Sequence, residues 1–176
     1  MIEPKLPNAV PLLLTPNRRS ARWERHIELG IIHATGPGGF RSAVDWLRQA
    51  KRKNRTSAHY VVDRDGTIIQ LAPENDITWH AGYGRWGNRG AINTRSIGIE
   101  LVNKNDGIEE YPPAQLEACM WICVRLAREH GRRPEHFIGH NDVDPIRKTD
   151  PKAFPWVDFR ASMAANLRQP QGGSET

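Results

Sequence analysis

The sequence contains no long apolar run, only two cysteines and no internal repeat. A membrane-spanning helix needs roughly 20 consecutive apolar residues, and no segment approaches that length. The apolar stretch 10–14 is too short, and too interrupted by proline, to be the core of a secretory signal. We therefore expect a chain without a membrane span, synthesised in the cytoplasm without a signal peptide. Its 176 residues suit one domain with a substantial core.

Acidic residues are the minority among the charged ones, and the net charge of +5 suits an anionic partner. Nucleic acid, an acidic lipid surface and the bacterial cell wall all fit, and charge alone does not choose among them. No standard nucleic-acid-binding motif is visible, so we expect no specific nucleic-acid partner. Six tryptophans are many for this length, and we expect some of them to form a binding surface rather than core.

Residues 1–28 combine several prolines with a basic run of arginines. These arginines are Arg18, Arg19, Arg22 and Arg25. We expect an extended N-terminal arm laid over the domain, whose arginines form a solvated basic face or, alternatively, meet an acidic polymer. The remaining chain divides into a domain at 29–168 and a tail at 169–176, whose composition predicts disorder.

Short apolar runs alternate with amphipathic segments along the domain. We expect strands at 29–33, 58–63, 67–72 and 96–102, the end of another strand at 137–138, and helices at 40–51, 113–130 and 157–168. Arg64-Asp65-Gly66 separates the second and third runs and predicts a β-hairpin. Because strands and helices alternate irregularly around one hairpin, we predict an α/β fold with a central mixed β-sheet flanked by helices.

The segment 113–130 is the clearest helix. Pro113 suits its first turn, and Gly131 supplies its end. Cys119 and Cys123 lie one helical turn apart in its apolar stripe. A CxxxC pair alone is a weak metal motif, so we expect two buried thiols.

The segment GHNDVDPIRKTDPKAFPW, residues 139–156, concentrates polar groups and prolines. Such a run is expected to be a stiff surface loop without helix or strand, with His140 at a strand end and Asp150 brought back towards it. Imidazole with carboxylate is the ligand chemistry of a catalytic zinc, which needs a third protein ligand. His33, at the tip of a central strand, is a natural third ligand, and His59 is a rival candidate.

Two further features point to a site: a carboxylate within an apolar strand and a glycine-rich loop. Glu100 lies in the strand, where an unpaired carboxylate is costly to bury, so it is either in a structural salt bridge or a general base. Trp79 and His80 open the loop, which runs to Gly90 and carries Arg85. Aromatic residues interleaved with arginines suggest a groove wall for a polar, ring-bearing ligand, and a mobile surface loop fits equally well.

Five motifs occur in one order along the chain. They are IIHATGPGG, SAHYVVDRDG, TWHAG, RSIGIELVN and GHNDVDPIRKTDP. In this order they resemble the zinc-dependent N-acetylmuramoyl-L-alanine amidases of the type 2 family, which includes phage endolysins, the cytoplasmic anhydro-muropeptide amidase and the peptidoglycan recognition proteins. The resemblance covers roughly residues 29 to 160 and implies the amidase/peptidoglycan recognition protein-like fold.

The resemblance implies one zinc ion per chain, held by His33, His140 and Asp150. It assigns catalytic roles to Glu100 as general base and to Lys148, which stabilises the oxyanion. The implied reaction is metal-assisted hydrolysis of the amide that joins the lactyl group of N-acetylmuramic acid to L-alanine.

The resemblance also moves the remaining histidines to supporting or substrate-binding roles. The substrate-binding candidates are His59, His80, Trp79 and Arg85. Two positions depart from the family. Ala58 stands where some relatives have a catalytic tyrosine, and Lys152 stands where glycine usually follows the Asp-Pro pair.

Hydrolysis is favoured over muropeptide binding without cleavage, because all three ligand positions and both catalytic positions are present. Among amidases, a small basic domain without a wall-binding module resembles an endolysin of a phage that infects Gram-negative bacteria. Such an endolysin acts on peptidoglycan in the periplasm after release. The alternative is a cytoplasmic recycling amidase for anhydro-muropeptides. In either case we expect a monomer.

Overall fold

The computed structural model describes residues 10–50 and 55–169 of the chain. Its centre is a five-stranded sheet in the order β4-β3-β6-β2-β7. These strands are β2 (Leu29–Ala34), β3 (Tyr60–Val62), β4 (Ile68–Gln70), β6 (Ser96–Leu101) and β7 (Phe137–Gly139). Four of them run parallel and β4 runs antiparallel to β3, so the predicted mixed sheet and its hairpin are confirmed.

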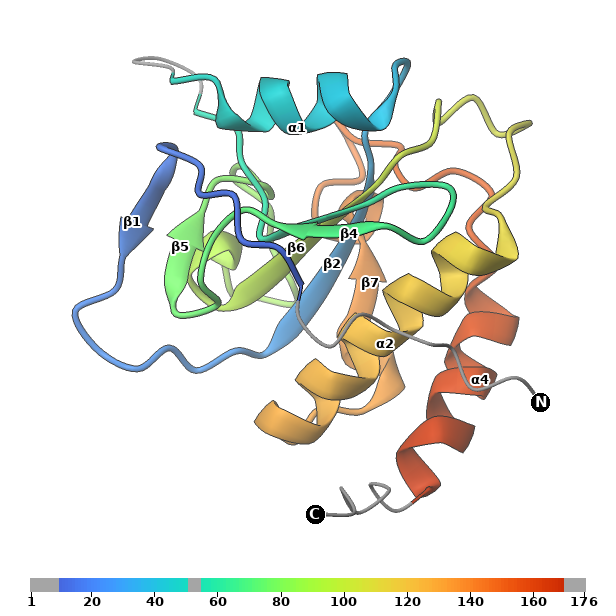
Figure 1. Ribbon diagram of the computed structural model, residues 1–176. Helices are drawn as coiled ribbons and strands as arrows, with labels where there is room; N and C mark the ends of the chain where they lie inside the picture. Colours follow the sequence, from blue (N-terminus) through green and yellow to red (C-terminus); the bar gives the residue numbers. More distant parts are fainter. Residues whose placement is uncertain (1–9, 51–54, 170–176) are drawn as a thin grey trace, which may run out of the picture.

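Helices cover both faces of this sheet (Figure 1). They are α1 (Phe40–Arg48) on one face and α2 (Pro113–His130) with α4 (Trp156–Arg168) on the other. Alternate side chains of β3 explain the layering: Val61 packs with α1, whereas Tyr60 and Val62 lie in the core beneath α2 and α4. The predicted α/β architecture is confirmed.

The two central strands are buried along their whole length. Every residue of β6 is buried, and all of β2 except its last residue is buried. Parallel strands covered on both faces are expected to be apolar throughout. His33 and Glu100 break that rule, and they occupy paired positions in the register of β2 and β6. The polar exceptions therefore meet at the carboxyl edge of the sheet.

The segment that precedes β2 lies against the domain and forms strand pairing with another part of it. Within it, β1 (Arg18–Ser20) pairs antiparallel with β5 (Asp76–Thr78). Arg25 is only 5% exposed, and its guanidinium donates to the carbonyl oxygens of Glu74, Asn93 and Ser96 at 2.6, 2.9 and 2.7 Å. The expected solvated position is therefore wrong for Arg25. The division of the chain at residues 28 and 168 stays a prediction, and residues 1–9 and 170–176 lie outside the described residues.

The main difference between the expected and observed helices is at the beginning of the polar segment 139–156. Its first residues form a short helix, α3 (His140–Val143), where a loop without helix was expected. The first helix ends at Arg48 rather than at 51, and residues 51–54 lie outside the described part of the chain. Two 3₁₀ turns, Ile92–Thr94 and Pro134–His136, were not predicted.

Helix α2 has the predicted bounds, and Gly131 ends it in the left-handed conformation at φ 64°. Cys119 and Cys123 are both buried free thiols, as predicted. No helix within residues 10–50 and 55–169 is long and apolar enough to cross a bilayer.

Gly30 of β2 lies against the buried ring of Phe137 in β7. A Cβ atom added at Gly30 would lie 2.4 Å from Phe137 Cδ1. Gly30→Ala is therefore expected to lower the free energy of unfolding by about 1–3 kcal/mol in urea titrations, the usual cost of overpacking. Gly39→Ala is the matched control, because nothing lies within 4 Å of its added Cβ. A loss no larger than that of the control would contradict the prediction.

Candidate active site and metal centre

Three side chains that are far apart in the sequence meet at the carboxyl edge of the sheet. His33 is on β2, and His140 follows β7 directly as the first residue of α3. Because β2 and β7 are parallel neighbours, both histidines lie at the same edge. Asp150 comes from the loop after α3. The Nδ1 atoms of His33 and His140 are 3.0 Å apart, and Asp150 Oδ2 lies 3.3 and 3.1 Å from them, respectively.

The geometry of these three atoms fits a zinc ion. Bonds of about 2.0–2.1 Å in a tetrahedron separate two ligand atoms by about 3.3 Å, and the three separations here are 3.0, 3.1 and 3.3 Å. Two imidazole nitrogens and one carboxylate oxygen also form the donor set of catalytic zinc sites that keep one position open. Electron-rich atoms that converge in a buried place repel one another unless a cation or proton lies between them. The residues present therefore fit the metal.

The ionisation states of these side chains also suit a metal. Burial lowers the pKa of His33 to about 4, against the opposing effect of its hydrogen bond with Asp150. Burial on its own would raise the pKa of Asp150, but hydrogen bonds with His140 and His33 outweigh it and hold that pKa well below its usual range. Neutral imidazole and ionised carboxylate are the forms that bind a metal ion.

A chain of hydrogen bonds orients the ring of His33. Its Nε2 lies 3.0 Å from His80 Nδ1, and His80 Nε2 lies 3.1 Å from the Ser96 hydroxyl oxygen. Ser96 donates its hydroxyl proton to the carbonyl of Ile92 at 2.7 Å. The Ser96 oxygen must then accept from His80 Nε2–H, which leaves His80 Nδ1 to accept from His33 Nε2–H. This order places the free lone pair of His33 on Nδ1, the atom that faces the other two ligand candidates.

Glu100 and Lys148 lie beside the three candidate ligands. Glu100 is 9% exposed, and no described residue makes a hydrogen bond or ion pair with its carboxylate, so the alternative of a structural salt bridge is wrong. Burial and then the charge of Asp150 raise the pKa of Glu100 to about 8, whereas Lys148 acts in the opposite direction. A carboxyl group with a pKa near neutrality can both take up and release a proton, as general acid–base catalysis requires.

These residues line a cleft of about 480 Å³. One wall comes from the loop 35–39 and from the face of α1 that carries Ser42, Ala43, Trp46 and Leu47. Trp46 is 58% exposed there. Sequence reasoning missed this wall. The signal was available in the spacing 42, 43, 46 and 47, which marks one face of the helix that follows the His33 strand.

The four predicted substrate-binding residues lie in different places. His80 lines the cleft. The guanidinium carbon of Arg19 lies 5.9 Å from the ring centroid of Trp79, and Arg85 donates to the carbonyl of Asn88 at 2.7 Å. Neither Trp79 nor Arg85 is among the residues that line the cleft. Their role in substrate binding stays a prediction.

His59 is completely buried, away from the cleft. Its Nδ1 accepts the backbone N–H of Gly98 at 3.0 Å, and its Nε2 lies 3.0 Å from the carbonyl oxygen of Asp76. Both ring nitrogens are therefore used inside the domain. The predicted substrate contact and the rival role as a metal ligand are both wrong for His59.

One other group of possible metal ligands occurs among the described residues: Glu74, Glu129 and His130. Arg125 forms ion pairs with both carboxylates, the one with Glu129 at 3.1 Å. The guanidinium already supplies the positive charge at this position, so these residues do not define a second metal centre.

Residues 23–153 match the family described as N-acetylmuramoyl-L-alanine amidase, Amidase_2. The chain therefore belongs to this family, and the predicted family and fold are confirmed. It is similar to the N-acetylmuramoyl-L-alanine amidase AmiD of Escherichia coli (strain K12), with 34% identity over 157 residues. That match covers 81% of this chain and 55% of AmiD, so the chain spans little more than half the length of this relative.

Two solved structures share the fold. A crystal structure of a selenomethionine derivative of AmpD has a TM-score of 0.78 and 26% identity, covering 89% of this chain and 95% of that chain. A complex of AmiD from E. coli with the substrate anhydro-N-acetylmuramic acid-L-Ala-D-γ-Glu-L-Lys has a TM-score of 0.70 and 31% identity, covering 82% and 60%, respectively.

The buried imidazole of His59 makes folding stability depend on pH. Burial, reinforced by the charge of Arg25, lowers the pKa of His59 to about 4 in the folded protein, from an ordinary value of 6.5. As the pH falls, His59 is protonated in the unfolded chain before it is protonated in the folded protein. The contribution of His59 to the free energy of unfolding is therefore complete above pH 6.5 and is lost between pH 6.5 and 4. We expect a loss of about 3 kcal/mol from this residue over that window.

His59→Gln removes the titrating group and keeps a hydrogen-bond donor and acceptor at the same position. In urea titrations of the metal-free proteins, the variant should lose less unfolding free energy than the unmodified protein when the pH falls from 6.5 to 4. Equal losses in the two proteins would show that His59 does not titrate in this range.

Proposed function

We propose that this chain is a zinc-dependent N-acetylmuramoyl-L-alanine amidase, which hydrolyses the amide between the lactyl group of N-acetylmuramic acid and L-alanine. The observation that carries the proposal is the convergence of His33, His140 and Asp150 at the cleft floor, with ligand atoms 3.0–3.3 Å apart. Family membership supports the bond that is cut. The substrate described for the AmiD complex supports a muropeptide or peptidoglycan as the ligand of the cleft.

We assign the zinc site to His33, His140 and Asp150. A zinc ion held by these residues would supply Lewis-acid chemistry, polarising the scissile carbonyl and making the attacking water more acidic. Glu100, at the same edge of the sheet, takes a proton from the attacking water and delivers it to the leaving amine of L-alanine. The pKa of Glu100, which burial raises to about 8, falls when a cation lies nearby, so the base is ionised near neutral pH.

Lys148 supplies a point charge at the rim of the cleft, where the carbonyl oxygen of the substrate gains negative charge. Ala58, which stands where some relatives have a catalytic tyrosine, is completely buried and has no polar group that could take part in catalysis. The proton transfer therefore falls to Glu100, and the stabilisation of charge falls to Lys148 and the metal.

We further propose that the biological substrate is the intact wall, as in a phage endolysin that reaches the periplasm after release. The basic net charge supports an anionic polymer as substrate. Recycling of soluble anhydro-muropeptides is the second candidate, and it is favoured by the similarity to AmpD and by the anhydro-sugar in the AmiD complex.

Glu100→Gln is expected to lower kcat by about 100-fold or more, because an amide side chain cannot accept the proton. Zinc content, measured by elemental analysis, should remain one ion per chain in this variant. Glu117→Gln is the matched control: Glu117 is exposed on α2, and its replacement should leave kcat unchanged. Wild-type activity in Glu100→Gln would remove Glu100 from the mechanism.

The two candidate substrates can be compared by mass spectrometry of the released fragments. The purified protein is incubated in parallel with intact sacculi and with soluble anhydro-muropeptides. An endolysin is expected to release free stem peptides from sacculi at a rate at least comparable with the soluble reaction. Cleavage of the soluble substrate alone would favour recycling. Cleavage that persists after chelation of all metal would contradict the zinc site in either case.

A further inference from the structure

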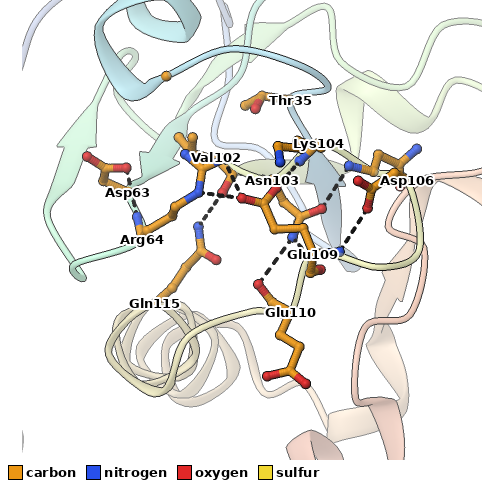
Figure 2. Close-up of polar contacts among 12 residues, drawn as sticks. Thr35, Asp63, Arg64, Val102, Asn103, Lys104, Asp106, Glu109, Glu110 and Gln115 are labelled. Carbon is orange, nitrogen blue, oxygen red and sulfur yellow. Dashed lines mark hydrogen bonds and ion pairs between the residues drawn. The ribbon is translucent and has the colours of Figure 1, made fainter.

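The loop 102–111, which follows β6, contains a network of hydrogen bonds made by its own polar side chains (Figure 2). Asp106 Oδ1 accepts the backbone N–H of Glu109 at 2.8 Å. The Glu109 carboxylate accepts the backbone N–H of Lys104 at 2.5 Å and Arg64 Nε at 2.8 Å. We call this segment the bracing loop. It is tied internally and also to the β3–β4 hairpin, which carries Arg64.

The buried side chain of Asn103 completes the bracing loop from inside. Asn103 is 1% exposed, and its Nδ2 donates to the carbonyl of Glu109 at 3.0 Å. Its Oδ1 accepts the backbone N–H of Asn105 at 2.8 Å. Asn105 itself has a φ of 59°, in the left-handed region that asparagine, aspartate and glycine tolerate better than other residues. The backbone of Asn105 is therefore set by the loop.

From this position Asn105 reaches the segment that carries the third candidate metal ligand. Its Oδ1 accepts the backbone N–H of Lys152 at 2.7 Å, and its Nδ2 donates to the hydroxyl of Thr149 at 3.3 Å. These two partners lie immediately on either side of Asp150 and Pro151. One carboxamide thus spans the ligand position, and it uses both its donor and its acceptor to do so.

Two further hydrogen bonds fix the same short segment. The Tyr111 hydroxyl donates to the carbonyl of Lys152 at 3.2 Å, and the backbone N–H of Asn141 donates to the carbonyl of Asp150 at 2.9 Å. The side chains of Thr149 and Lys152 are exposed. Pro151 is buried and adds packing, but the exposed residues on either side of the Asp150–Pro151 pair are held by these hydrogen bonds, which therefore help to determine where the Asp150 carboxylate points.

We propose that Asn105 is a positioning residue for the metal centre: its carboxamide clips residues 149–152 so that Asp150 meets His33 and His140. The inference rests on the proposed function, because it concerns the same zinc site. Groups that orient metal ligands typically change metal affinity by 10–100-fold when they are removed. Asn105 makes no contact with the ligand atoms and acts only through the backbone and the hydroxyl around Asp150.

The experiment compares Zn²⁺ affinity, measured by competition with a chelator, in the unmodified protein and in variants of residue 105. Asn105→Gly keeps the left-handed backbone and removes the carboxamide, whereas Asn105→Ala removes the carboxamide and adds backbone strain. Asn105→Asp retains an acceptor for the Lys152 N–H. Ile108→Ala is the matched control, since Ile108 is on the same loop and 85% exposed.

Asn105→Gly and Asn105→Ala should each weaken Zn²⁺ binding by about tenfold or more. Asn105→Asp should recover most of the affinity, and Ile108→Ala should bind like the unmodified protein. Hydrogen exchange of the Lys152 amide should be faster in Asn105→Gly than in the unmodified protein even without metal, because its acceptor is gone.

Unchanged Zn²⁺ affinity in Asn105→Gly would overturn the inference, as would a loss confined to Asn105→Ala, which would reflect strain alone. These outcomes leave the proposed function intact if the unmodified protein binds Zn²⁺ and cleaves its substrate. An unmodified protein that binds no Zn²⁺ would instead overturn both.

Discussion

The parallel pairing of β2 with β6 on one side and with β7 on the other is the constraint on which the site depends. Parallel neighbours end at one edge of a sheet, so His33, Glu100 and His140 arrive together although more than a hundred residues separate the first from the last. Period-two alternation then directs Ile97, Ile99 and Leu101 into the core under α2 and leaves Glu100 on the other face. A one-residue slip of β6 would exchange these faces.

The buried histidines behind His33 are tolerable because His59 and His80 find hydrogen-bond partners inside the domain, whereas Nε2 of the candidate ligand His140 has none among the described residues. His59 uses both ring nitrogens, and His80 relays from His33 to Ser96. The carbonyl of Ser96 in turn accepts from Arg25 at 2.7 Å. A buried network of this kind is rigid when every member is satisfied. The orientation of His33 is therefore supported, through two intermediate residues, by a side chain that precedes the first strand of the main sheet.

Local sequence patterns predicted most of the secondary structure and the type of sheet correctly. The Asp-Gly turn, the apolar runs and the bounds of α2 follow from short-range chemistry, and the family motifs placed His33, His140 and Asp150 where the structure brings them together. The predictions that failed concerned the surroundings of individual polar side chains. His59 and Arg25 look like surface or site residues in the sequence, because a pattern does not reveal which carbonyl oxygens will surround a donor. Some tryptophans were expected to form a binding surface, but composition alone does not indicate which ones, and Trp46 at the cleft was therefore not singled out.

The carbonyl oxygens bound by Arg25 come from two separate stretches of chain, one at Glu74 and one that includes Asn93 and Ser96. Residues 11–15 add backbone hydrogen bonds beside β4, among them Leu13 N–H to the carbonyl of Gln70 at 2.8 Å. This leading stretch thus belongs to the same cooperative unit as the sheet. A partner protein or affinity tag fused to this chain is best joined ahead of residue 10, because a fusion that begins at β2 would remove the hydrogen-bond donors that Arg25 and residues 11–15 supply to the buried interior.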